Sequence, residues 1–194
     1  PLSVSIGFEQ GVPVAINGEK IVDGASSLAV LNESFGAYGV GRGIYTGDTI
    51  VGLKGRIVYE CPGIEVLMLA HKALEELTLT KHQNEFKAFA ATKWTELVFG
   101  GQFFEPLRSN LEGFIASTQV LVSGTVRVET HGGSALAVSV ETDHALMDDS
   151  NVYAQKAGWD AKDAEGFIRI AGNSAAIGAS KLASGRGSGS ELSC

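Results

Sequence analysis

Apolar side chains occupy every second position at the start of the chain, which is the pattern of a half-buried β-strand. Two such runs, residues 2–8 and 12–16, are separated by the turn-forming segment Glu9–Gly11. Asn17-Gly18 is then a strong signal for a tight hairpin turn, and residues 19–22 add a third short run. The first 22 residues therefore predict an antiparallel meander.

The middle of the chain changes to the spacing of three and four residues that is typical of amphipathic helices. The segment 64–79 is apolar almost all round, so we expect this helix to be buried. Pro106 is well suited to the first turn of a helix. The spacing predicts helices over about residues 26–37, 64–79 and 82–99, and a fourth that begins near Pro106.

Between the first two helices the pattern predicts a loop and a strand. Residues 36–47 are rich in glycine and are expected to form a loop. Residues 50–59 predict a strand with Ile57 and Tyr59 on one face and Lys54 and Arg56 on the other. Alternation returns over residues 120–128 and 136–140, where Gly132-Gly133 predicts a hairpin turn.

The last part of the chain differs in composition. An irregular segment covers residues 142–159, and residues 163–168 predict a short helical turn. From about Gly172 onward, Gly, Ser and Ala dominate, a composition that is poor for burying apolar surface. The expected fold is α+β, an antiparallel β-sheet packed against several α-helices. It comprises one domain over residues 1–171 and a Gly/Ser-rich flexible tail over 172–194, which either stays disordered or orders on a partner.

Composition and charge exclude several classes of protein. Of the 194 residues, 44% are hydrophobic, which is enough for a core, and the formal net charge of −7 argues against nucleic acid as a partner. No apolar run approaches the roughly 20 residues that cross a bilayer. We expect no signal segment before the first strand, and a chain that begins at Pro1 is expected to be an excised piece. Cys61 and Cys194 are expected to be reduced thiols of a cytoplasmic protein.

Residue patterns alone offer little chemistry. Gly39–Gly43 suggests a phosphate loop, but it follows a helix and precedes a strand, which favours an ordinary loop. No histidine lies at metal-ligand spacing, and His71 is expected to be a hydrogen-bonded core residue. Lys54 and Arg56 either clamp a carboxylate or form a solvated sheet face. These patterns by themselves predict an α+β protein and do not assign it a function.

Six segments, in the same order and with matching gaps, resemble argininosuccinate synthase over about residues 2–170. They are Ile6–Gly18, Gly39–Arg42, Val58–Gly63, Glu96–Phe99, Gly124–Arg127 and Asp163–Ile168. The resemblance implies a ligase of arginine biosynthesis and the urea cycle, which condenses citrulline with aspartate at the expense of ATP (with Mg). It also implies a cytoplasmic homotetramer.

The family's ATP-binding loop has no counterpart in this sequence. The resemblance therefore implies the C-terminal synthetase portion, which binds no cofactor alone and is inactive without an N-terminal ATP-binding half. The family's C-terminal extension serves oligomerisation, and the Gly/Ser composition of this tail is poor for a helix there.

The resemblance also carries over one site residue. Tyr59 matches the family tyrosine that contacts citrulline. Twelve residues earlier, where the family has a glutamate that also holds citrulline, this chain has Gly47, and the neighbouring Asp48 is the candidate substitute. Lys54 and Arg56 are further candidates for substrate binding. Because of Gly47, a ligase-like homologue with a different amino-acid substrate stays open, as does a non-catalytic assembly module.

Overall fold

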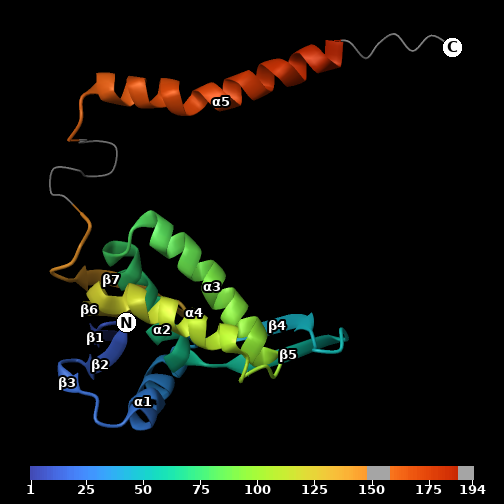
Figure 1. Cartoon of the computed structure of the whole chain (residues 1–194). Coiled ribbons are helices and arrows are strands. Elements are labelled where there is room, and N and C mark those ends of the chain that lie inside the picture. Colours follow the sequence, from blue (N-terminus) through green and yellow to red (C-terminus); the bar gives the residue numbers. More distant parts are fainter. Residues whose placement is uncertain (148–157, 188–194) are drawn as a thin grey trace. The chain divides into compact units, whose positions relative to one another are not determined.

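The computed structural model describes residues 1–147 and 158–187 (Figure 1). The chain divides into two units, Pro1–Leu146 and Met147–Cys194. The first unit holds two antiparallel sheets and the helices α1 to α4, which confirms the expected α+β class. Within the described ranges, no helix combines the length and the apolar character needed to cross a membrane.

The larger sheet has five strands in the order β3-β2-β1-β6-β7, with every neighbouring pair antiparallel. The central strand β1 pairs with β2 on one side and with the distant β6 on the other, so that Ile6 lies opposite both Ile16 and Val126. The predicted meander and the hairpin at Gly132-Gly133 are confirmed. The strands are β1 Ser3–Glu9, β2 Val12–Ile16, β3 Glu19–Lys20, β6 Gly124–His131 and β7 Ser134–Glu141.

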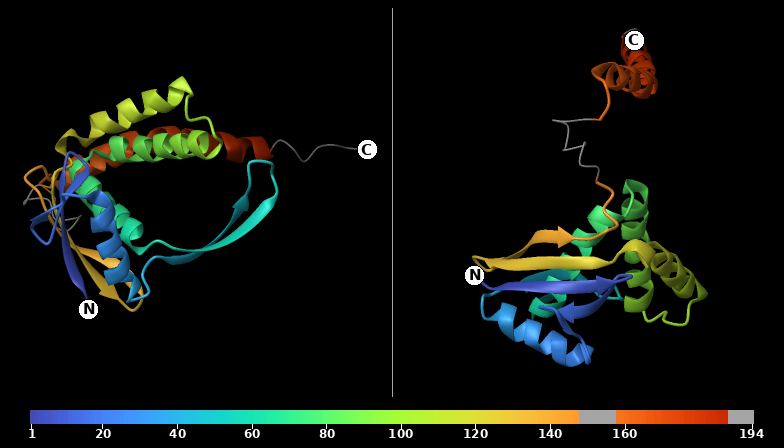
Figure 2. Two further views of the ribbon diagram at one scale, coloured as in Figure 1. Left: turned by 90° about the horizontal axis from the view of Figure 1, so that it is seen from below. Right: turned by 90° about the vertical axis from the view of Figure 1, so that its left-hand side faces the viewer.

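One face of this sheet packs against α1 (Gly24–Gly36) and α2 (Pro62–Thr78) (Figures 1 and 2). Alternate residues of β1 and β6 point into the same core as one stripe of each helix, because the strand period of two and the helix period of 3.6 each align their apolar residues. Each fully buried aliphatic side chain contributes about 1.5–3 kcal/mol. The core includes Ile6, Val126, Val128, Leu31, Phe35, Val66, Ala70 and Leu74.

The other predicted helices are present as α3 (Lys81–Phe99) and α4 (Pro106–Thr118). Thr80 and Gln83 form a capping box at the start of α3, in which each side chain accepts a backbone N–H of the other residue. Two expectations were wrong in part. The strand predicted from residue 120 begins only at Gly124, because Gln119–Leu121 form a 3₁₀ turn. The helix α2 is not buried all round, since its apolar residues Ile64 and Met68 are exposed.

A separate hairpin joins α1 to α2. It consists of β4 (Arg42–Asp48) and β5 (Lys54–Glu60), and it extends away from the five-stranded sheet (Figure 2). The glycine-rich segment 36–47 was predicted to be a loop, and this is wrong from residue 42 onward. The pairing with β5 supplies backbone hydrogen bonds to a segment whose glycines give it little strand propensity of its own.

The second unit contains the helix α5 (Ala161–Gly187). The short helical turn predicted at residues 163–168 is part of it. The segment from residue 172, whose composition is poor for a helix, is nevertheless helical as far as Gly187. Alanine, the best helix former, occupies five positions between Ala171 and Ala183 and offsets the cost of the glycines. Cys194 lies outside the described residues, and the domain boundary at residue 171 stays a prediction.

Gly41 sets the direction in which the hairpin leaves the core. Its φ is +76°, and a Cβ at this position would lie 2.5 Å from the backbone nitrogen of Pro62. The Cys61 N–H donates to the Gly41 carbonyl at 2.9 Å. The start of β4 is thereby held against the first residues of α2.

We expect Gly41→Ala to destabilise the domain more than Gly18→Ala. Both substitutions place alanine at a positive φ, at a cost of about 1–2 kcal/mol. Only Gly41 has backbone atoms in the way, which adds about 1–3 kcal/mol. Urea unfolding of both variants measures the difference, and equal losses of stability would contradict the close approach.

Candidate functional site

The register of the β4–β5 hairpin sorts the predicted site residues onto two faces. Directly opposed residues share a face, and successive residues alternate. Asp48 pairs with Lys54, and Thr46 pairs with Arg56, on what we call the charged face. Residues 43, 45, 47, 55, 57 and 59 form the opposite face, which we call the glycine face. Tyr59 is therefore separated from the other three candidates by the thickness of the hairpin.

On the charged face, the Lys54 ammonium contacts a carboxylate oxygen of Asp48 at 2.7 Å, and both side chains are largely exposed. An exposed pair of this kind contributes at most about 1 kcal/mol. Within the part of the chain that the structure describes, no hydrogen bond or ion pair engages the Arg56 side chain. Because the Lys54 ammonium is already paired with Asp48, Lys54 and Arg56 do not form a pair of free cations that could bind a carboxylate.

On the glycine face, two tyrosine rings lie over glycines. A Cβ added to Gly43 would lie 2.5 Å from the Tyr59 hydroxyl, and one added to Gly47 would lie 2.7 Å from Cε1 of Tyr45. These rings occupy the space that larger residues would need. Tyr59 is 43% exposed, so its hydroxyl is accessible to a ligand. A glutamate at position 47 would require the Tyr45 ring to move.

The segment Gly39–Gly43 does not form a phosphate cradle. The Gly39 N–H donates to the Gly36 carbonyl at 2.8 Å, and the Val40 N–H donates to the Phe35 carbonyl at 3.3 Å. Arg42 Nε donates to the Gly39 carbonyl at 3.0 Å. These amides complete the end of α1 instead of facing a ligand, so the segment does not fit the phosphates of ATP.

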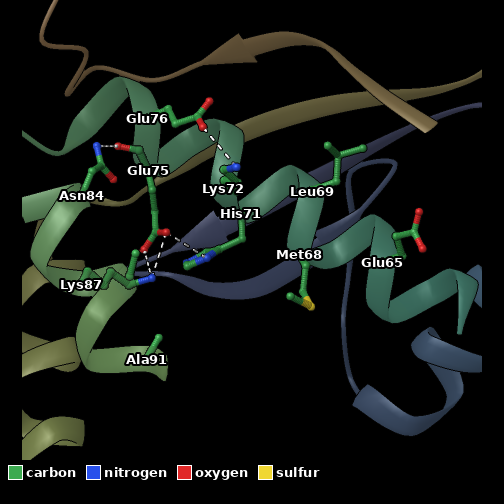
Figure 3. A pocket seen from close by; sticks show the side chains of 11 residues that line it. Glu65, Met68, Leu69, His71, Lys72, Glu75, Glu76, Asn84, Lys87 and Ala91 are labelled. Carbon is green, nitrogen blue, oxygen red and sulfur yellow. Dashed lines mark hydrogen bonds and ion pairs between the residues drawn. The ribbon is translucent and has the colours of Figure 1, made fainter. Parts of the chain in front are cut away.

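A second hollow, of about 590 Å³, lies between α2 and α3 (Figure 3). The Glu75 carboxylate dominates it and is only 9% exposed. Lys87 Nζ donates to both carboxylate oxygens at 2.7 and 2.9 Å. Gln119 Nε2 donates to Glu75 Oε1 at 2.7 Å. The carboxylate is therefore fully engaged and holds α2, α3 and the turn after α4 together.

His71 belongs to this polar cluster. Its Nε2 lies 2.9 Å from Gln119 Oε1, and since the Gln119 amide nitrogen donates to Glu75, the imidazole is the donor. Its ring also contacts the Phe8 ring, with the centroids 5.6 Å apart. The histidine is half-buried and hydrogen-bonded, as expected from the sequence.

An adjoining group links α3 to α4. Trp94 Nε1 donates to a carboxylate oxygen of Glu112 at 2.9 Å, and Arg108 Nη1 contacts the same oxygen at 2.5 Å. The hydrogen bond from Trp94, and then the positive charge of Arg108, hold the pKa of Glu112 below its ordinary value. The Arg108 guanidinium also lies 4.2 Å from the centre of the Phe103 ring.

Residues 1–147 and 158–187 contain no candidate metal-binding cluster. No three His, Cys, Asp or Glu side chains there are grouped so as to hold an ion. Cys61 is a half-buried free thiol. The exposed hairpin is therefore the best candidate site, and the signal that sequence reasoning missed there is Tyr45, which lies in the segment predicted to be a loop.

The fold and the hairpin define an α+β domain that presents polar side chains on an exposed strand pair. The sequence model of the arginosuccinate synthase C-terminal domain matches residues 1–177. The chain belongs to the argininosuccinate synthase family.

Individual relatives agree with this assignment. An argininosuccinate synthase of Xylella fastidiosa is 50% identical over 177 residues, which are 91% of this chain and 44% of the relative. One of Pyrococcus furiosus is 44% identical over 173 residues, 89% of this chain and 42% of the relative. The chain thus spans less than half the length of these relatives.

Lys87→Met should destabilise the domain by about 3–5 kcal/mol, because it leaves the buried Glu75 carboxylate without its cation. Lys72→Met is the matched control, since Lys72 makes an exposed pair with Glu76 at 3.7 Å that contributes less than about 1 kcal/mol. Denaturant unfolding measures both. A Lys87 variant as stable as the Lys72 variant would show that Glu75 is not held as described.

Trp94→Phe should raise the pKa of Glu112 toward its ordinary value, because it removes the hydrogen bond that lowers it most. Arg108→Lys, which keeps the charge, should raise it less. A depressed carboxyl pKa stabilises the folded state above the unfolded pKa, and this is lost as the pH falls through the folded pKa. An NMR titration of the Glu112 carboxyl tests the order; a larger shift in the Arg108 variant would contradict it.

Proposed function

We propose that this chain is the C-terminal portion of an argininosuccinate synthase-like ligase, which condenses citrulline with aspartate in arginine biosynthesis. The observation that carries the proposal is the match over residues 1–177 together with 50% identity to a synthase over most of the chain. The contribution of this portion is to hold citrulline and to supply subunit contacts in a homo-oligomer. A cytoplasmic location and a homotetramer remain predictions.

Tyr59 is the proposed citrulline contact. Its phenol is accessible, and its position is fixed by the ring lying over Gly43. A phenol both donates and accepts, so it suits the charged amino-acid end of citrulline. One hydrogen bond to a charged group contributes about 1.5–3 kcal/mol, or at least tenfold in affinity.

ATP, with Mg, is assigned to the rest of the full-length protein. When bound there, ATP would convert the ureido oxygen of citrulline into an AMP ester with release of pyrophosphate, so that the aspartate amine could displace AMP at the ureido carbon. In the described residues, the Gly39 and Val40 amides of this segment are used at the end of α1, which argues against a phosphate site there. The chain alone is therefore expected to be inactive.

Gly47 supports a second candidate, a ligase-like homologue with a different amino-acid substrate. Asp48, the proposed substitute for the family glutamate, is paired with Lys54 and lies on the opposite face from Tyr59. Because the two residues lie on opposite faces, the Asp48 side chain could contact a ligand held by Tyr59 only past the edge of the strand pair. Lys54 and Arg56 share that charged face, so they would contact a substrate only on the side of the hairpin away from Tyr59. A non-catalytic assembly module is the third candidate.

The test is pyrophosphate release from ATP, citrulline and aspartate, with this chain mixed with the N-terminal half of the Xylella fastidiosa relative. Release only in the mixture supports the ligase. Tyr59→Phe should raise the KM for citrulline about tenfold, since it removes one hydrogen bond to a charged group. Tyr38→Phe, which removes a phenol hydroxyl at the end of α1, is the matched control and should leave the KM unchanged.

Two outcomes would count against this proposal. No release from the mixture, with the two halves shown to associate, would favour a different substrate or an assembly role. To separate these two, other amino acids that carry an amide or a carboxylate are offered in place of citrulline. Equal effects of the Tyr59 and Tyr38 variants would remove Tyr59 from the site.

A further inference from the structure

Helix α3 has an inner side and an outer side. The inner side faces α2 and carries Asn84, Lys87 and Ala91, which line the hollow beside Glu75 (Figure 3). An α-helix has 3.6 residues per turn, so a residue two positions away lies on the opposite side. Phe89 is two positions from both Lys87 and Ala91. Its side chain therefore points away from α2, and it is 68% exposed.

Three phenylalanine rings form an apolar patch on this outer side. The Phe86 ring lies 6.0 Å from the Phe89 ring and meets the Phe114 ring of α4 edge-on at 5.1 Å, measured between centroids. Phe86 is itself 55% exposed. Aromatic residues are enriched at protein–protein contacts, because they bury a large area and lose little side-chain freedom. The patch thus has the composition of a contact surface.

The charges on the two sides of Phe89 mirror one another with opposite sign. Glu85 lies four residues before it, and Lys93 lies four residues after it. His82 lies seven residues before it, and Glu96 lies seven residues after it. Residues four and seven positions from a central residue share its face of an α-helix. When this face is read in the reverse direction, an acidic side chain therefore takes the place of a basic one.

These side chains are available to a partner. In the part of the chain that the structure describes, their ion pairs stay within α3. Lys93 pairs with Glu96 at 2.8 Å, and Glu85 lies 3.8 Å from both Lys81 and His82. Pairs between exposed side chains contribute little and are easily rearranged. They do not prevent the same charges from facing a second surface.

We propose that the outer side of α3 is a surface through which two copies of this chain associate, with their α3 helices antiparallel about a two-fold axis at Phe89. Residues equally far from Phe89 in opposite directions then meet. Glu85 faces Lys93 of the partner subunit, and the two Phe89 rings meet at the axis. A two-fold contact uses the same patch twice and requires a self-complementary surface. Parallel helices would instead place like charges opposite one another.

This inference rests on the proposed contribution of the chain to subunit contacts, and it names the surface that supplies one of them. The 19 residues of α3 extend over about 28 Å. A contact between two helices of this length, with Phe114 of α4 beside them, is small for a specific interface. The association is therefore concentration-dependent, and sedimentation equilibrium over a range of concentrations measures it with the chain alone.

Removal of the central ring is the first test. Phe89→Ser should weaken the association at least about tenfold, because aromatic residues at the centre of a contact contribute most of its free energy. Phe104→Ser is the matched control. It removes a 94% exposed ring that lies beyond the end of α3, and it should leave the association unchanged. Circular dichroism shows whether each variant keeps its fold.

Charge reversal tests the antiparallel pairing. Glu85→Lys alone, or Lys93→Glu alone, should weaken the association at least about tenfold, because each places like charges opposite one another at two symmetric positions. An equimolar mixture of the two variants should associate as the unmodified chain does, since one supplies the lysines and the other the glutamates. The chain with both substitutions should do so too. Lys72→Glu, an exposed reversal on α2, should have no effect.

Three outcomes would overturn this interface. They are an unmodified chain that stays monomeric at every concentration, single variants that associate as tightly as the unmodified chain, and a mixture that associates no better than each variant alone. The last two would show that association uses another surface. None of these measurements involves citrulline, ATP or the N-terminal half. Their failure therefore leaves the ligase proposal standing, and a failure of pyrophosphate release leaves this interface standing.

Discussion

The packing of α2 against the central strands β1 and β6 is the contact on which the rest of this domain depends. Val66, Ala70 and Leu74 are fully buried on the helix, and they meet the fully buried Ile6 and Val126 on the sheet. Strand β1 comes from the start of the chain and β6 from beyond residue 120, so this core closes the domain across its whole length. Loss of α2 would leave both strands with an exposed apolar face.

The same helix also fixes the position of the candidate site. The first residues of α2 are bonded back to the chain on both sides, through the Cys61 N–H to Gly41 and the Gly63 N–H to the Asn32 side chain at 2.8 Å. The hairpin therefore leaves the core from a fixed point. An isolated two-stranded hairpin is marginally stable in water, so these bonds at the base of the hairpin help to hold it in place.

The two faces of the hairpin divide the chemistry. On the charged face, Asp48 and Lys54 form an ion pair that partly neutralises the charge. On the glycine face, the hydroxyls of Tyr45 and Tyr59 have no hydrogen-bond partner among the described residues. Glycine has a steric role here, because the tyrosine rings need its missing side chain in order to lie flat. The residue at position 47 is thus coupled to the neighbouring Tyr45 ring.

The sequence by itself determined the elements with strong local patterns. The meander over the first strands, the helices α1 to α4 and the alternation of Tyr59 with Lys54 and Arg56 all follow from apolar spacing and turn residues, which act over a few neighbours. The family resemblance, too, was readable in six short segments. These features need no knowledge of distant contacts, and the structure and the family match agree with them.

Only the tertiary structure decided the features that depend on distant partners. Residues 42–48 become a strand because β5 pairs with them, although their glycines predict a loop. The meeting of Glu75 with Lys87 and Gln119, and of Tyr45 with Gly47, depends on how helices and strands pack. Local propensity is weak where glycine dominates, so pairing and packing determine the conformation there.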